Sequence, residues 1–138
     1  MGGGVKPTLV LDTCALLDLV SERWNQENVK DSFLDSPNPA LLSISIWEIS
    51  RKFRIEKLRL PCEQHEILSF VRQVCEHFSI SIQPVSEVIC SEAECFPLYH
   101  RDPFDRMILA TAKLANCPVV TTDRVFQQYG VSVLEHRR

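Results

Sequence analysis

Short apolar runs alternate along the chain with stretches in which apolar residues recur every three or four positions. The runs at 8–11, 41–43, 79–85, 119–121 and 131–134 have the composition of strands. Helical spacing predicts helices over 14–20, from 45 onward, over 63–78 and over 103–115, with shorter ones beginning near 86 and 123. A polar stretch around 25–39 separates the first strand and helix from the next pair. Strands that alternate with helices predict an α/β fold with a mainly parallel central sheet flanked by helices.

The bulk composition fits one globular domain. The chain has 138 residues, of which 45% are hydrophobic and 24% charged, so we expect a flexible N-terminus over 1–7 and a single domain over 8–138. The sequence shows neither a secretory signal nor the roughly 18 consecutive apolar residues of a membrane span. Its six cysteines lack the spacing of a zinc site or a disulfide framework. These features predict a soluble cytoplasmic protein with free, buried thiols.

Four acidic residues fall where the predicted elements change type. Asp12 and Asp123 follow strands, whereas Glu48 and Asp105 lie in the first turns of helices. In open α/β sheets these positions share the edge at the carboxyl ends of the strands, where ligands bind. Four carboxylates there would repel one another unless a cation neutralised them, and an all-oxygen donor set favours Mg²⁺ or Mn²⁺. The pattern indicates an acid-lined site that holds a metal.

Each acid also has a structural interpretation. Glu48 would complete a capping box with Ser45 at the start of its helix. Asp105 suits the positive end of a helix, and Asp123 could be an N-cap. Asp12 is harder to explain in this way because an uncompensated charge at the end of a buried strand is costly. The joint placement of the four acids therefore carries the prediction.

Positive charge is not a general property of the chain, whose formal net charge is -3. A nucleic-acid substrate would need a local basic patch or the metal to attract it. Basic residues near the acids could contact phosphates, and they are Arg51, Lys52, Arg101, Arg106 and Arg124. The alternatives are an i,i+4 pair of Lys52 with Glu48, and pairing of Arg106 and Arg124 with nearby acids. Trp47 is expected in the core rather than as a platform for a nucleic-acid base.

Four segments, taken together, resemble the motifs of the PIN-domain ribonucleases, and within them the VapC-type toxins of toxin–antitoxin pairs. In chain order they are Leu9-Val-Leu-Asp12-Thr13, Ser45-Ile-Trp-Glu48-Ile-Ser-Arg-Lys52, His100-Arg-Asp-Pro-Phe-Asp105-Arg106 and Val120-Thr121-Thr122-Asp123-Arg124. The similarity extends from about Thr8 to Leu134, so it is more specific than any single motif. Cys14 and Glu56 depart from the residues that the family commonly has there, but neither change removes an acid.

The resemblance implies a PIN fold and divalent-metal-dependent endonucleolytic cleavage of RNA. It implies Asp12, Glu48, Asp105 and Asp123 as the catalytic acids. The implied metal ligands are Asp12 and Asp105, binding directly, and Asp123, which like Glu48 would act directly or through water. Substrate-binding or supporting roles fall to Thr121, Asp102, Arg106, Arg124 and Lys52. Further implications are a cognate antitoxin protein that blocks the site, and a homodimer.

Other proteins with acidic sites fit the sequence less well. A receiver domain would have paired acids after the first strand, and a haloacid-dehalogenase-like phosphatase would have Asp-x-Asp-x-Thr. Here the first strand ends with Asp12-Thr13-Cys14. The remaining alternative is a catalytically inactive PIN-like module that binds RNA or protein. The retention of all four acids argues against it.

Overall fold

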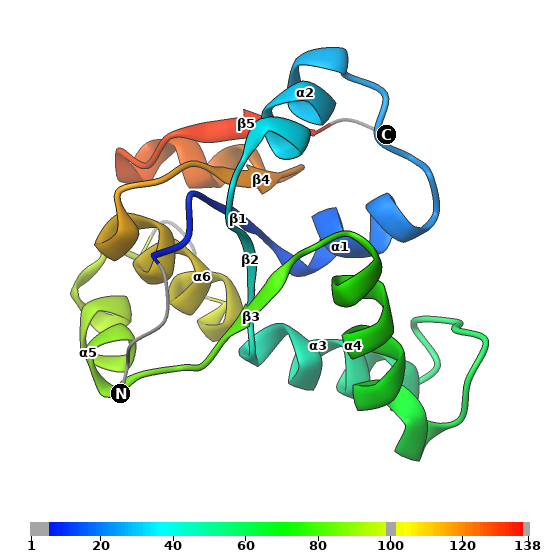
Figure 1. Ribbon diagram of the computed structural model, residues 1–138. Coiled ribbons are helices and arrows are strands. Elements are labelled where there is room, and N and C mark those ends of the chain that lie inside the picture. The colour runs from blue at the N-terminus through cyan, green and yellow to red at the C-terminus, as the bar shows by residue number, and fades with distance from the viewer. Residues whose placement is uncertain (1–5, 99–101, 137–138) are drawn as a thin grey trace.

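Five parallel strands form one sheet in the computed structural model, which describes residues 6–98 and 102–136 (Figure 1). They are β1 (Leu9–Leu11), β2 (Pro39–Leu42), β3 (Ser81–Gln83), β4 (Val119–Thr121) and β5 (Val133–Glu135), in the spatial order β3-β2-β1-β4-β5. Every pairing in this sheet is parallel. The predicted α/β fold with a mainly parallel sheet is confirmed. Most of the segment predicted to be flexible, residues 1–5, lies outside the described residues.

The three central strands are buried along their whole length. This explains why they appear in the sequence as continuous apolar runs, since both faces of a parallel sheet are covered by helices. Leu9 and Leu11 belong to the core on one face and Val10 to the core on the other, because successive side chains of a strand point to opposite faces.

Helices cover both faces of the sheet (Figure 1). The core on the first face includes residues of α1 (Thr13–Val20), α2 (Glu27–Asp35), α3 (Ile44–Arg54) and α4 (Ile67–His77), the last preceded by the short η1 (Gln64–Glu66). The core on the second face includes residues of α5 (Glu87–Cys95), α6 (Pro103–Ala115) and η2 (Arg124–Tyr129). Within residues 6–98 and 102–136, no helix is long and apolar enough to cross a membrane. All six cysteines are free thiols, but only Cys75 and Cys117 are buried, so the prediction of buried thiols is wrong for the other four.

Helix α2 forms inside the stretch that we interpreted only as a polar separator. Val29 and Phe33, one helical turn apart, are its only buried residues, and two apolar anchors among polar neighbours are too weak a periodic signal to predict a helix. Helix α3 also differs from expectation, because it begins at Ile44 with Ser43 as its N-cap. Ser45 therefore lies inside the helix, and the predicted capping box does not form.

The connections leave β1 in the middle of the sheet. The chain proceeds from β1 to β2 and β3 on one side, then crosses to β4 and β5 on the other. The direction of strand order thus reverses between β1 and β4, and such a switch point is where open α/β sheets bind ligands. Asp12 follows β1 at this point, and its backbone N–H donates to Val120 O at 3.1 Å.

Candidate active site

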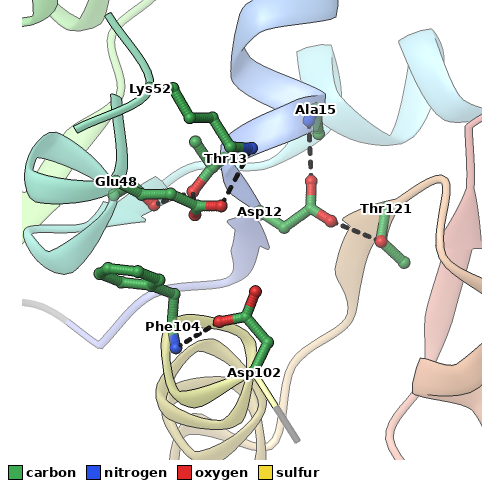
Figure 2. Close-up of polar contacts among 9 residues, drawn as sticks. Asp12, Thr13, Ala15, Glu48, Lys52, Asp102, Phe104 and Thr121 are labelled. Atoms are coloured by element: carbon green, nitrogen blue, oxygen red, sulfur yellow. Dashed lines mark hydrogen bonds and ion pairs between the residues drawn. The ribbon is translucent and has the colours of Figure 1, made fainter. Parts of the chain in front are cut away.

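Asp12 is held at the switch point by two hydrogen bonds to its carboxylate (Figure 2). It is the N-cap of α1, and its Oδ1 accepts from the backbone N–H of Ala15 at 2.7 Å. Its Oδ2 accepts from the hydroxyl of Thr121, at the end of β4, at 2.5 Å. The side chain is 5% exposed. These two donors partly compensate a carboxylate that would otherwise be costly to bury.

Glu48 is buried against the first turn of α1. Its Oε1 lies 2.5 Å from the hydroxyl of Thr13, which is itself 2.8 Å from the hydroxyl of Ser45. Its Oε2 lies 3.1 Å from Nζ of Lys52, one turn along α3. The i,i+4 pair is therefore present, while Ser45 contacts Thr13 instead of capping the helix. The Thr13 hydroxyl and the Lys52 ammonium fix the direction of the Glu48 carboxylate (Figure 2).

Two acids lie at the start of α6. Asp102 is its N-cap and accepts from the backbone N–H of Phe104 at 2.9 Å. Asp105 follows in the first turn. Figure 2 shows the Asp102 side chain rising from α6 toward the space below Asp12 and Glu48. Helix α6 thus brings its acids to the edge of the sheet where β1 ends.

Asp123 is the N-cap of η2, where its Oδ1 accepts from the backbone N–H of Val125 at 2.9 Å. The backbone N–H of Asp123 donates to the Thr121 hydroxyl, also at 2.9 Å. Thr121, which is fully buried, thus connects the first and the last acid. Its hydroxyl accepts from the backbone of Asp123 and donates its own proton to Asp12.

The four acids lie close enough for their charges to interact. Burial raises the pKa of Asp12 to about 6, the charges of Glu48 and Asp123 add to this effect, and the bonds from Thr121 and Ala15 oppose it. Burial also raises the pKa of Asp105 to about 8, reinforced by the charges of Asp102, Asp12, Glu48 and Asp123. All four predicted acids therefore converge, although they come from elements far apart in the sequence.

The donor set matches a hard divalent cation in its chemistry. Carboxylate oxygens are the ligands that Mg²⁺ and Mn²⁺ prefer, and a cation would relieve the repulsion that raises these pKa values. In the described part of the chain, however, no three Asp, Glu, His or Cys side chains stand in positions that could together hold a metal ion. One oxygen of Asp12 accepts from the Thr121 hydroxyl. The oxygens of Glu48 are bonded to the Thr13 hydroxyl and to Lys52. A metal would require some carboxylates to turn toward one point.

The basic residues differ in their relation to the acids. Lys52 lies at the site and is about one-third exposed. Arg106 is buried, and its guanidinium donates to the carbonyls of Phe96 and Pro97 at 2.7 and 3.0 Å, so it stabilises the connection between α5 and α6. Arg124 is exposed and pairs with Glu135 at 3.2 Å. Arg101 lies outside the described residues. Lys52 forms an ion pair with a site acid, Glu48.

Sequence reasoning missed two features of this region, the role of Thr13 and the position of Trp47. Thr13 follows Asp12 directly, and the only signal of its role was a hydroxyl next to a site acid. Trp47 was expected in the core, but it is 59% exposed, so that prediction is wrong. Its ring meets the ring of Phe104 edge to face, with centroids 5.4 Å apart.

Comparison with known proteins identifies the fold. A family model described as the PIN domain matches residues 9–131. Among solved structures, VapBC2 from Rickettsia felis, bound to a promoter DNA fragment, has a TM-score of 0.68 at 13% identity and covers 94% of this chain and 98% of that chain. FitAcB from Neisseria gonorrhoeae has a TM-score of 0.63 at 20% identity, with 92% and 96% covered. A toxin–antitoxin complex from Klebsiella pneumoniae has a TM-score of 0.55 at 21% identity, and the match covers 83% of this chain and 86% of that chain. No curated protein sequence matches the chain.

Proposed function

Because the chain belongs to the PIN domain family, we propose that it is a metal-dependent endoribonuclease and the toxin of a toxin–antitoxin pair. The observation that carries the proposal is the convergence of Asp12, Glu48, Asp105 and Asp123 at the switch point of the sheet. A buried cluster of like charges is costly to fold. Such a cost is typical of a functional site.

Asp12, Asp105 and Asp123 would hold a Mg²⁺ or Mn²⁺ ion, and Glu48 would act beside them directly or through water. The bound ion would supply a water of lowered pKa and would stabilise charge that develops on the phosphodiester. Glu48 would accept the proton of the attacking water, because its carboxylate is positioned by Thr13 and Lys52. Thr121 would keep Asp12 in place during this step.

The test is cleavage of an end-labelled pool of cellular RNA by the purified full-length protein, with Mg²⁺ or Mn²⁺ and then with EDTA. We expect cleavage that requires the metal and is lost in both Asp12→Asn and Asp105→Asn. Asp35→Asn, an exposed acid on α2, is the matched control and should cleave normally. If folded wild-type protein cuts nothing, or if the two site variants cut equally well, the inactive binding module becomes the better interpretation.

We also propose that a cognate antitoxin protein occupies the surface around α1. The fold is shared with a toxin–antitoxin complex, and a hollow of about 400 Å³ opens among α1, α2 and α4, with Leu19, Trp24, Phe33 and Leu34 in its lining. Leu34 is 75% exposed there. Co-expression with the neighbouring open reading frame should restore growth if the chain alone is toxic. Absence of toxicity and of binding would remove the toxin role while leaving the nuclease role in place.

A homodimer in the cytoplasm completes the proposal. The exposed apolar side chains include Ile55, Leu68 and Leu114, and a second copy could cover some of them. Sedimentation of the purified protein over a range of concentrations measures this directly. A single species of monomer mass at every concentration would contradict the dimer.

A further inference from the structure

Trp47 and Phe104 form an aromatic pair beside the acids. Each directly precedes a site acid, since Trp47 is followed by Glu48 and Phe104 by Asp105. The two rings join α3 to α6, with centroids 5.4 Å apart and planes at 82°. Phe104 is partly buried, whereas Trp47 is 59% exposed. The other tryptophan, Trp24, is only 4% exposed. The edge-to-face geometry thus supports the Trp47 indole on one side while much of it remains open to solvent.

The same face of α3 continues from Trp47 into positive charge. Arg51 and Arg54 lie four and seven residues after Trp47, so helical periodicity places all three on one side of the helix, and both arginines are exposed. Over the seven residues α3 rises by about 10 Å. Five of the nine residues 51–59 are Lys or Arg and one is Glu, although the whole chain has a net charge of -3. Arg54 and Arg59 line one hollow of about 730 Å³.

We propose that Trp47, supported by Phe104, stacks on an unpaired base of the RNA substrate, and that Arg51 and Arg54 bind the neighbouring phosphates. This proposal rests on the proposed nuclease function and assigns the residues that would bind an unpaired base, without base specificity, beside the acids. An aromatic face accepts any base, because every base has a π-face, but only a base that is not held in a duplex can reach it. Guanidinium groups pair with phosphate oxygens.

The surroundings of Trp47 favour RNA over a protein partner. A negatively charged chain repels a polyanion everywhere except at a local basic patch, and segment 51–59 is such a patch. Trp47 directly precedes Glu48 on α3, so a strand stacked on the Trp47 ring would lie close to the acids. Ring stacking also contributes affinity that does not depend on charge, which matters beside a cluster of carboxylates.

Intrinsic fluorescence tests the stacking. The chain has two tryptophans, so the difference between wild type and Trp47→Phe isolates the signal of Trp47. We expect a short single-stranded oligoribonucleotide of mixed sequence, added without divalent metal, to quench this difference signal. The same oligonucleotide annealed to its complement should quench it much less. Equal quenching by the duplex, or no quenching at concentrations where the strand binds, would overturn the proposal.

Binding and cleavage kinetics separate positioning from folding. Trp47→Ala should weaken single-strand binding and raise KM by about 5- to 150-fold, the range for loss of one stacked base. Trp47→Phe should restore most of the affinity because it retains an aromatic face. Val88→Ala, which also removes exposed apolar surface but from α5, should bind as wild type. Arg51→Gln should reduce the dependence of affinity on salt.

The outcomes distinguish this proposal from the one on which it rests. If the protein cleaves RNA but Trp47→Ala leaves KM unchanged, the proposed base stacking on Trp47 is overturned and the proposed nuclease function still stands. If wild type binds single strands through Trp47 but cuts nothing, the platform stands and the nuclease fails. If Trp47→Ala instead changes the oligomeric state and leaves RNA binding intact, the aromatic pair belongs to a protein contact and the proposal is overturned.

Discussion

His136 Nε2 lies 3.1 Å from Asp18 Oδ2, and the two side chains are 0% and 4% exposed. The residues are 118 positions apart, so their contact connects the end of β5 to α1, the helix that Asp12 caps. Trp24 covers this pair, with its ring centroid 5.4 Å from that of His136 and its indole N–H donating to the carbonyl of Ala15. The C-terminal strand and the helix beneath the active site are therefore coupled.

Removal of one partner from this buried pair should destabilise the folded protein. We expect His136→Ala to lower the free energy of unfolding by roughly 2–4 kcal/mol, because the Asp18 carboxylate loses a buried partner and a cavity forms. Urea denaturation followed by circular dichroism measures the change. His65→Ala, an exposed histidine in η1, is the control and should change stability by less than about 0.5 kcal/mol. A similar small change for His136→Ala would mean that the contact contributes little.

Thr121→Val tests the support of Asp12. The Thr121 hydroxyl bond lowers the pKa of Asp12, which burial has raised to about 6. Its removal should therefore raise that pKa further and weaken metal binding at neutral pH. A carbon-detected NMR titration of the aspartate carboxyls would follow the shift, with Thr122→Val as the control. An unchanged titration of Asp12 would show that Thr121 acts only in packing.

The stability of the metal-free protein should depend on pH through Asp105. Its pKa is about 8 in the folded chain against 3.8 for the ordinary side chain. Between these values the folded state holds more protons than the unfolded state, so stability is greatest at the acidic end and falls as pH rises toward 8. Asp105→Asn should flatten this slope and raise Tm at pH 8 by roughly 3–10 °C. Thermal scans without divalent metal would measure both, and a wild-type slope of the opposite sign would contradict the assignment.

Metal binding should release protons. Carboxyl groups must be ionised to coordinate a cation, and the pKa values of Asp12 and Asp105 are about 6 and about 8. At pH 7 we expect release of about one proton per metal bound, and a cleavage rate that increases from pH 6 to pH 8. Calorimetric titration with Mn²⁺ in buffers of different ionisation enthalpy counts the protons. Binding heats that are the same in every buffer would argue against a carboxylate site.

The acids and the strands were predictable because their signals are local. A buried parallel strand is a continuous apolar run, and the acid after Leu11 or shortly after Thr121 stands out against it. The ends of α6 at Pro103 and Ala115 were equally clear, because a few adjacent residues, including the caps Asp102 and Asn116, determine where a helix starts and stops. The convergence of the acids followed from the rule that the carboxyl ends of parallel strands share one edge.

The features that escaped prediction depend on contacts between distant segments. Nothing in the sequence distinguishes Thr13 from the other four threonines. Its role depends on the packing of α3 beside α1, which brings Glu48 to its hydroxyl. Trp47 looked like a core residue because a large aromatic side chain usually gains by burial, and only the tertiary structure shows that it faces outward. Arg106 is the opposite case, a charged side chain that is buried. Its guanidinium donates to backbone carbonyls whose position could not be inferred from the sequence.

The pairing of β1 with β4 has a consequence for the order of events during synthesis. Thr121 and Asp12 are 109 residues apart, and β4 must enter the sheet beside β1 before they can meet. Non-local pairings of this kind form late, after the entropy of closing a long loop has been overcome. The acids therefore cannot assemble on a nascent chain whose last quarter is still inside the ribosome. The cluster of acids at the end of β1 is therefore completed only when translation is nearly finished.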